Sequence, residues 1–202
     1  MEFGIFNSFW DKYPNHLPFL NLMESDDDPK EWNLQTSISK LYSILNSSSN
    51  EEVSEGLNLL LQSEDWRPHL IASVSLLAID VAKRDGFIDT LWNRLFRGSW
   101  ISPQILVVLS LIDRDFTFKA EKILTEGFKV NYINISPIEH HVSRGGTSER
   151  PANGKVIAAI HYLLDKTLKV SIDCDLGGAL TKEWSESLSE LTDKGRIHFK
   201  RF

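Results

Sequence analysis

The 202-residue chain has a single cysteine, Cys174, and no long apolar run. One cysteine excludes an internal disulfide and a multi-cysteine metal site, which favours a reducing compartment. The longest apolar stretch, ILVVLSLI, falls well short of the about 18 residues that a membrane span needs. The first residues, MEFGIFNSFWDKYP, include Glu2 and lack the basic start of a signal peptide. We therefore expect a cytoplasmic protein without a membrane segment.

Basic side chains are scarce in the first half of the chain. The net charge is 22 − 28 = −6; residues 1–100 carry 15 acidic and 8 basic side chains, whereas residues 101–202 carry 13 and 14. Such a first half repels a nucleic-acid backbone and attracts a basic protein. Its densest acidic stretch, ESDDDPKE, is flanked by tryptophans, so an aromatic and acidic contact patch is one interpretation and a solvated loop is the other. The candidate partner-binding residues are Trp10, Glu24, Asp26, Asp27, Asp28, Glu31 and Trp32.

Recognisable catalytic motifs are also missing. The best candidate is IEHHVSRGGTSERPANGK, in which Glu139, His140, His141 and Arg144 are residue types that bind zinc, transfer protons or hold an anion. Adjacent histidines cannot share a helix face, and no H-E-x-x-H arrangement is present. The glycines before Lys155 lack the Walker spacing. We expect no catalytic residue, cofactor or metal, and keep the segment 136–155 as an alternative ligand or enzyme site.

Apolar residues recur at helical spacing along most of the chain, which predicts an all-α single domain, 1–202, of about eight or nine helices. Asp28 and Pro29 are typical of a helix start, and so are Ser49 with Glu52, a capping box. The segment QILVVLSLI is apolar on nearly all sides and is expected to be central. Residues 129–153 are predicted to be a long loop, with an extended segment near 130–135, before C-terminal helices over 154–194.

Two further helices are expected to be amphipathic. The first starts at Trp66 and carries an apolar stripe that Ala78 and Ala82 widen; the second covers KVIAAIHYLLDKTL and directs Leu168 inward. We expect His69 and His161 to be interfacial or core-edge histidines and not ligands, since each sits inside an amphipathic helical pattern.

A tryptophan and a proline precede an apolar helix twice, in DWRPHLIASVSLL and SWISPQILVVLSLI, with Pro68 and Pro103 separated by 103 − 68 = 35 residues. The first of these segments resembles the second helix of a HEAT-type repeat, and the resemblance extends over residues 50–128. It implies stacked antiparallel helix pairs, a HEAT-like α-solenoid or helical bundle, that present a surface to a macromolecule. The period is shorter than the HEAT unit, and only two copies are clear.

The function expected from these features is a non-catalytic protein-binding module. Its most concrete form is a bacterial immunity or inhibitor protein that neutralises a basic toxin domain by charge complementarity. Two alternatives remain: an enzyme or ligand-binding domain that uses the 136–155 loop, and a regulatory or scaffold domain that self-associates through its aromatic patch.

Overall fold

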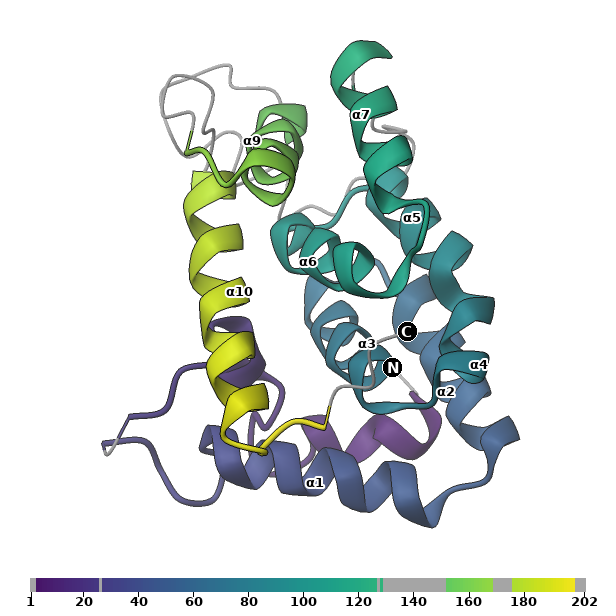
Figure 1. Ribbon diagram of the computed structural model, residues 1–202. Coiled ribbons are helices and arrows are strands. Elements are labelled where there is room, and N and C mark those ends of the chain that lie inside the picture. The colour runs from purple at the N-terminus through teal and green to yellow at the C-terminus, as the bar shows by residue number, and fades with distance from the viewer. Residues whose placement is uncertain (1–2, 26, 127, 129–151, 169–175, 199–202) are drawn as a thin grey trace.

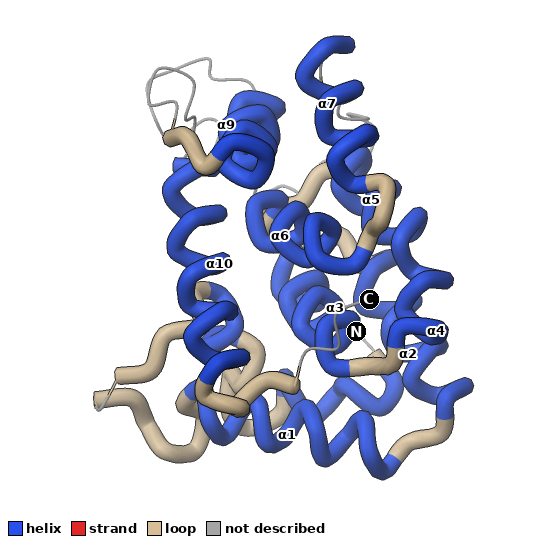
Figure 2. The backbone as a smooth tube through the Cα atoms, in the orientation of Figure 1, coloured by secondary structure: helices blue, strands red, loops and turns tan. Residues whose placement is uncertain are grey.

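A computed structural model describes residues 3–25, 27–126, 128, 152–168 and 176–198. All regular structure in these ranges is helical, which confirms the predicted all-α class (Figure 2). None of the helices in these ranges is both long enough and apolar enough to span a bilayer. The elements in chain order are the 3-10 helices η1 (Gly4–Trp10) and η2 (Leu17–Leu20), then α1 (Leu34–Ser47), α2 (Asn50–Gln62), α3 (Trp66–Ala78), α4 (Val81–Arg84), the 3-10 helix η3 (Asp85–Phe87), α5 (Ile88–Arg97), α6 (Ser102–Ile112), α7 (Phe116–Glu126), α9 (Ala152–Asp165) and α10 (Gly177–Asp193).

The predicted capping box starts α2. The Ser49 hydroxyl accepts a hydrogen bond from the Glu52 backbone N–H at 3.2 Å, and the Glu52 carboxylate accepts one from the Ser49 backbone N–H at 2.8 Å. These bonds satisfy two backbone donors that the helix itself cannot pair. They also lower the pKa of Glu52. Pro103 lies in the first turn of α6, as predicted.

The predicted start of α1 at Asp28 and Pro29 is wrong. The helix begins at Leu34, and the side-chain oxygen of Asn33 accepts a hydrogen bond from the Thr36 backbone N–H at 2.8 Å. The Asp28 carboxylate instead accepts one from the Ser25 N–H at 3.2 Å, within a local turn. A short polar side chain favours a turn as readily as a helix cap, so the sequence alone did not distinguish the two positions.

Helices α3 and α6 form the centre of the molecule. Every side chain from Trp66 to Leu77 is buried except that of Arg67, and every side chain from Ser102 to Leu109 is buried. The two helices pack against each other; α2 contacts α3, whereas α5, α9 and α10 contact α6. Figure 1 shows α9 and α10 on one side of α6, and α5 and α7 on the other. The expectation that QILVVLSLI is central is confirmed.

Two residues that were expected to face inward are exposed. Ala82 lies in the short helix α4, because α3 already ends at Ala78 and Ile79 is extended. Leu168 is 39% exposed, since α9 ends at Asp165 and Lys166 adopts a φ of 58° that stops the helix. In both cases the apolar periodicity of the sequence continues beyond the residue at which the helix ends. Helix α9 also begins at Ala152, inside the predicted 129–153 loop; residues 129–151, including 130–135, lie outside the described part of the chain.

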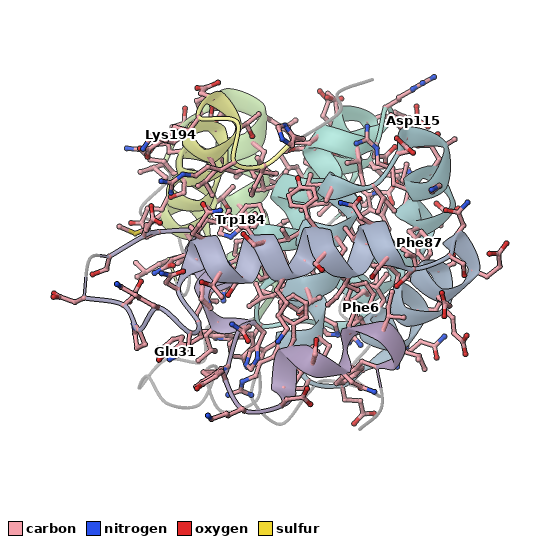
Figure 3. All side chains as sticks on the ribbon, turned by 90° about the horizontal axis from the view of Figure 1, so that it is seen from below. Phe6, Glu31, Phe87, Asp115, Trp184 and Lys194 are labelled. Carbon is pink, nitrogen blue, oxygen red and sulfur yellow. The ribbon has the colours of Figure 1, made fainter. Side chains whose placement is uncertain are left out.

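The N-terminal segment is fastened to helices from much later in the chain. The indole N–H of Trp184 in α10 donates to the Phe19 carbonyl at 3.0 Å, and the Gln104 amide in α6 donates to the Leu20 carbonyl at 3.1 Å. Trp184 is buried and is labelled in Figure 3. These bonds fix η2, and therefore the start of the acidic segment that follows it.

Candidate partner-binding surface

The acidic segment lies between η2 and α1. We call residues 23–33 the acidic loop; in Figure 2 it projects as a tan loop beyond the helices at the lower left. At its start, Glu24 forms an ion pair with Arg196, which follows α10. Leu22, immediately before the loop, is 3% exposed and belongs to the core. The first end of the loop is thus anchored by an apolar side chain and an ion pair.

The second end of the loop is held by two hydrogen bonds. The Asn15 amide donates to the Glu31 carbonyl at 3.0 Å, and the Thr36 hydroxyl donates to the Lys30 carbonyl at 2.7 Å. Both bonds use backbone oxygens, so the carboxylate of Glu31 stays exposed (Figure 3). The side chain of Asp27 is exposed too. Asp26 lies outside the residues that the structure describes.

Trp10 and Trp32, the two expected aromatic members of the patch, have different surroundings. Trp10 in η1 is half-buried; its ring stacks on His16 at 5.3 Å between centroids and lies 4.6 Å from Phe3. Trp32 is half-buried within the acidic loop, where its backbone N–H donates to the Pro29 carbonyl. No ring contact joins the two tryptophans in the described ranges.

His16 fixes the orientation of Trp10. A carbonyl oxygen can only accept, so the His16 Nδ1–H donates to Phe9 O, at 3.2 Å. Burial lowers the pKa of His16, and the bond to Phe9 opposes this effect. A neutral imidazole therefore supports the indole ring near neutral pH.

A pocket of about 510 Å³ opens beside Trp10, toward the start of α3. It brings Trp10 and Phe3 together with the carboxylates of Asp11 and Asp65. Asp65 also caps α3, accepting a hydrogen bond from the Arg67 backbone N–H at 3.0 Å, and pairs with the Arg67 guanidinium. Sequence reasoning missed both aspartates as members of this surface. Asp11 and Asp65 lie near Trp10 because of how η1 packs, and no local sequence pattern predicts this packing.

The histidine of DWRPH has a structural role. His69 is 1% exposed; its Nε2–H donates to the Ser63 carbonyl at 2.9 Å, and its Nδ1 accepts from the Ser99 hydroxyl at 2.8 Å. The buried Arg94 donates to the same Ser63 carbonyl. Burial, and next the charge of Arg94, lower the pKa of His69 to about 3. This histidine is therefore neutral at physiological pH and does not carry protons there.

The alternative loop site, Glu139, His140, His141 and Arg144, lies outside the described residues, as does Cys174. Within the described ranges, no three histidine, cysteine or carboxylate side chains gather as a metal site requires.

A second concave surface, which no pattern in the sequence indicated, lies between α5 and α7. It is a groove of about 540 Å³ with Trp92, Phe96 and Ile123 in its lining. Phe96, on the α5 side of the groove, is 37% exposed. The groove is formed by two helices that are not consecutive in the chain, so neither helix alone predicts it.

Comparison with protein-family models, with curated proteins and with solved structures gives no match. The functional proposal below therefore rests on the residues and contacts of this chain.

Proposed function

We propose that this protein is a non-catalytic binding module for a basic protein partner, and that the acidic loop contacts this partner. The observation that carries the proposal is the way in which the loop is held. Its ends are fixed by Glu24 to Arg196 and by Asn15 to the Glu31 carbonyl, whereas the carboxylates of Asp27 and Glu31 face solvent. Fixed charges bind a partner with less loss of conformational entropy than mobile ones.

The concrete form that we propose is an acidic immunity or inhibitor protein that works in the cytoplasm and neutralises a basic toxin domain by direct binding. Charge complementarity of this kind accelerates association and disfavours partners of the wrong sign. The surplus of acidic over basic residues in the first half supplies the long-range attraction. Asp11, beside Trp10, extends the same sign of charge to the neighbouring pocket, whereas Asp65 in that pocket is paired with Arg67.

We also propose that α2–α3 and α5–α6 are two HEAT-like units. Trp66 at the start of α3 and Trp100 just before α6 hold equivalent places in the two units, and their rings are in contact. Helices α3 and α6 pack side by side, as the second helices of stacked pairs would. This interpretation is consistent with a scaffold that displays a binding surface.

The experiment compares the wild-type protein with the double variant Asp27→Asn/Glu31→Gln. Immobilised wild-type protein is incubated with extract of the source cell at low salt, and retained proteins are identified by mass spectrometry. Each candidate is then purified and titrated with both forms by calorimetry. We expect a basic partner whose affinity falls at least tenfold in the double variant and also falls with added salt.

The matched control is Glu55→Gln/Glu64→Gln, which changes the net charge by the same amount at two exposed positions outside the loop. It should bind the partner nearly as well as the wild-type protein. If both double variants weakened binding equally, the loss of affinity would be due to the net charge of the protein and not to the acidic loop. A partner that is acidic, or whose affinity is insensitive to the loop variant, would refute the proposal.

A further inference from the structure

The groove between α5 and α7 has a wall of nearly parallel aromatic rings. Trp92 and Phe96 stack with 29° between their planes, and Phe96 stacks on Phe128 at 5.5 Å and 22°. Trp92 also stacks on Phe116 at 27°. Phe116, Phe128 and Trp92 are buried, whereas Phe96, which lies between Trp92 and Phe128 in the stack, is 37% exposed. A flat ring placed in the groove would meet the exposed part of Phe96, and aromatic pairs are favourable edge-to-face as well as stacked.

The indole of this wall is held in place by a buried carboxylate. Asp113, 7% exposed, accepts hydrogen bonds through Oδ2 from Trp92 Nε1 at 2.7 Å and from the Lys119 ammonium at 2.8 Å. Burial raises the pKa of Asp113, but these bonds outweigh it and hold the pKa below its usual value. Asp113 therefore stays ionised and fixes both the indole and Lys119. A binding wall that is already ordered loses little entropy when a ligand arrives.

The charges of the groove limit what it accepts. Lys119 is committed to Asp113, whereas the ammonium of Lys122 is 59% exposed and lies 4.0 Å from the Glu126 carboxylate, the outer limit of an ion pair. Asp89 adds a carboxylate to the α5 side. Lys122 can thus pair with one acid group, whereas the second charge of a dianion such as a phosphate would add repulsion from Asp89 and Glu126 with no further cation to meet it.

We propose that this groove binds a planar aromatic molecule with a single negative charge, an aromatic carboxylate, its ring against Phe96 and Trp92 and its acid group at Lys122. The volume of the groove lies in the range of small-molecule sites, which combine an apolar lining with few polar groups. The site is separate from the acidic loop and shares no residue with it. Variants of the groove therefore test ligand binding without changing the acidic loop, and variants of the loop test partner binding without changing the groove.

The test uses three probes of the same shape and different charge: 2-naphthoate, the neutral 2-naphthylmethanol and the cationic 2-naphthylmethylammonium. Each is titrated into the full chain by calorimetry. We expect 2-naphthoate to bind at least about tenfold more tightly than the alcohol, because only the acid pairs a negative charge with the ammonium of Lys122. The ammonium compound should be the weakest of the three.

Two variants and two matched controls locate the site. Phe96→Ala removes the exposed ring, and Lys122→Gln removes the charge; each should weaken 2-naphthoate binding about tenfold. Phe118 lies on α7, as Lys122 does, and is 70% exposed. The variant Phe118→Ala should bind 2-naphthoate as the wild-type protein does. So should Lys182→Gln, whose ammonium also lies 4.0 Å from a glutamate one helical turn along, on α10.

Circular dichroism confirms that each variant is folded before it is titrated. The proposal is overturned if 2-naphthoate does not bind the wild-type protein at millimolar concentration, if Phe96→Ala binds it unchanged, or if the ammonium probe binds more tightly than the acid.

Discussion

The indole rings of Trp66 and Trp100 lie 4.7 Å apart with 56° between their planes. A cation covers each: the Arg67 guanidinium is 4.7 Å from the ring of Trp66, and the Lys155 ammonium is 5.1 Å from that of Trp100. Lys155 also donates to the Trp100 carbonyl at 2.7 Å. Contacts that begin at α3 thus extend past α6 to α9. The tryptophans of the two recurring tryptophan–proline segments contact each other and so join those segments.

Replacing either tryptophan should destabilise the fold. Trp66→Ala empties a buried site and is expected to lower the free energy of unfolding by about 3 kcal/mol; Trp100→Ala, half-buried, should lower it less. Urea unfolding measures both. In the double variant the two losses should fall short of additivity by about 1 kcal/mol, the energy of an aromatic pair. Fully additive losses would show that the ring contact contributes nothing.

His69 should make the stability depend on pH. Its pKa is about 3 in the folded protein, below its unfolded value of 6.5, so the unfolded chain binds the extra proton between these values. The stability from this group is complete above pH 6.5 and falls as pH is lowered, by up to about 1.4 kcal/mol per pH unit. His69→Gln lacks this titration. The stability difference between wild type and variant should therefore shrink between pH 7 and pH 5.

A comparison within the same protein separates this effect from other titrations. His16, whose pKa is also lowered, changes stability in the same direction and is present in both forms. It therefore cancels in the difference. A difference that stays constant from pH 7 to pH 5 would contradict the assigned pKa of His69.

Gly177 should tolerate no side chain. A Cβ at this position would lie 2.2 Å from the Lys155 carbonyl oxygen, a backbone atom that cannot move aside easily. Gly177→Ala should separate α10 from α9 and lower stability by about 2 kcal/mol. Gly86→Ala is the control, since nothing lies within 4 Å of its Cβ position. It should be neutral or slightly stabilising, and equal melting temperatures for the two variants would refute the close approach.

Asp113→Asn should weaken the junction of α5 and α7. The neutral amide lacks the charge that attracts the Lys119 ammonium, and asparagine has one oxygen fewer to accept hydrogen bonds from Trp92 and Lys119. We therefore expect the free energy of unfolding, measured in urea, to fall by about 2 kcal/mol. Asp115→Asn, two residues further and exposed, should change stability by less than about 0.5 kcal/mol. If the two variants lose the same stability, Asp113 is not the organising carboxylate.

The sequence predicted the elements that local chemistry determines. The capping box of Ser49 and Glu52 and the central position of α6 follow from neighbouring residues and from apolar content, and both are confirmed. The start of α1 was missed because Asp28 and Asn33 are both good caps. The choice depends on the bonds of Thr36 to Asn33 and to the Lys30 carbonyl, and on the bond from Asn15 to the Glu31 carbonyl. Leu168 was missed because periodicity does not show where a helix ends.

The candidate sites were predictable only in part. The acidic loop was identified from charge density, since exposed carboxylates are clustered in the sequence itself. The aspartates beside Trp10 and the groove at Phe96 come from contacts between separate elements, and a single sequence does not encode such contacts as a pattern. The alternative site at Glu139, His140, His141 and Arg144 stays a prediction.

The bonds from Trp184 to Phe19 and from Gln104 to Leu20 have a consequence for synthesis on the ribosome. The acidic loop is synthesised before Gln104 and Trp184, which fix its base, and before Arg196, which holds Glu24. A nascent or truncated chain would display the acidic residues without their fixed arrangement, since such long-range contacts form late. Under the proposed function, a chain cut before α10 is therefore expected to be a poor competitor for the same partner.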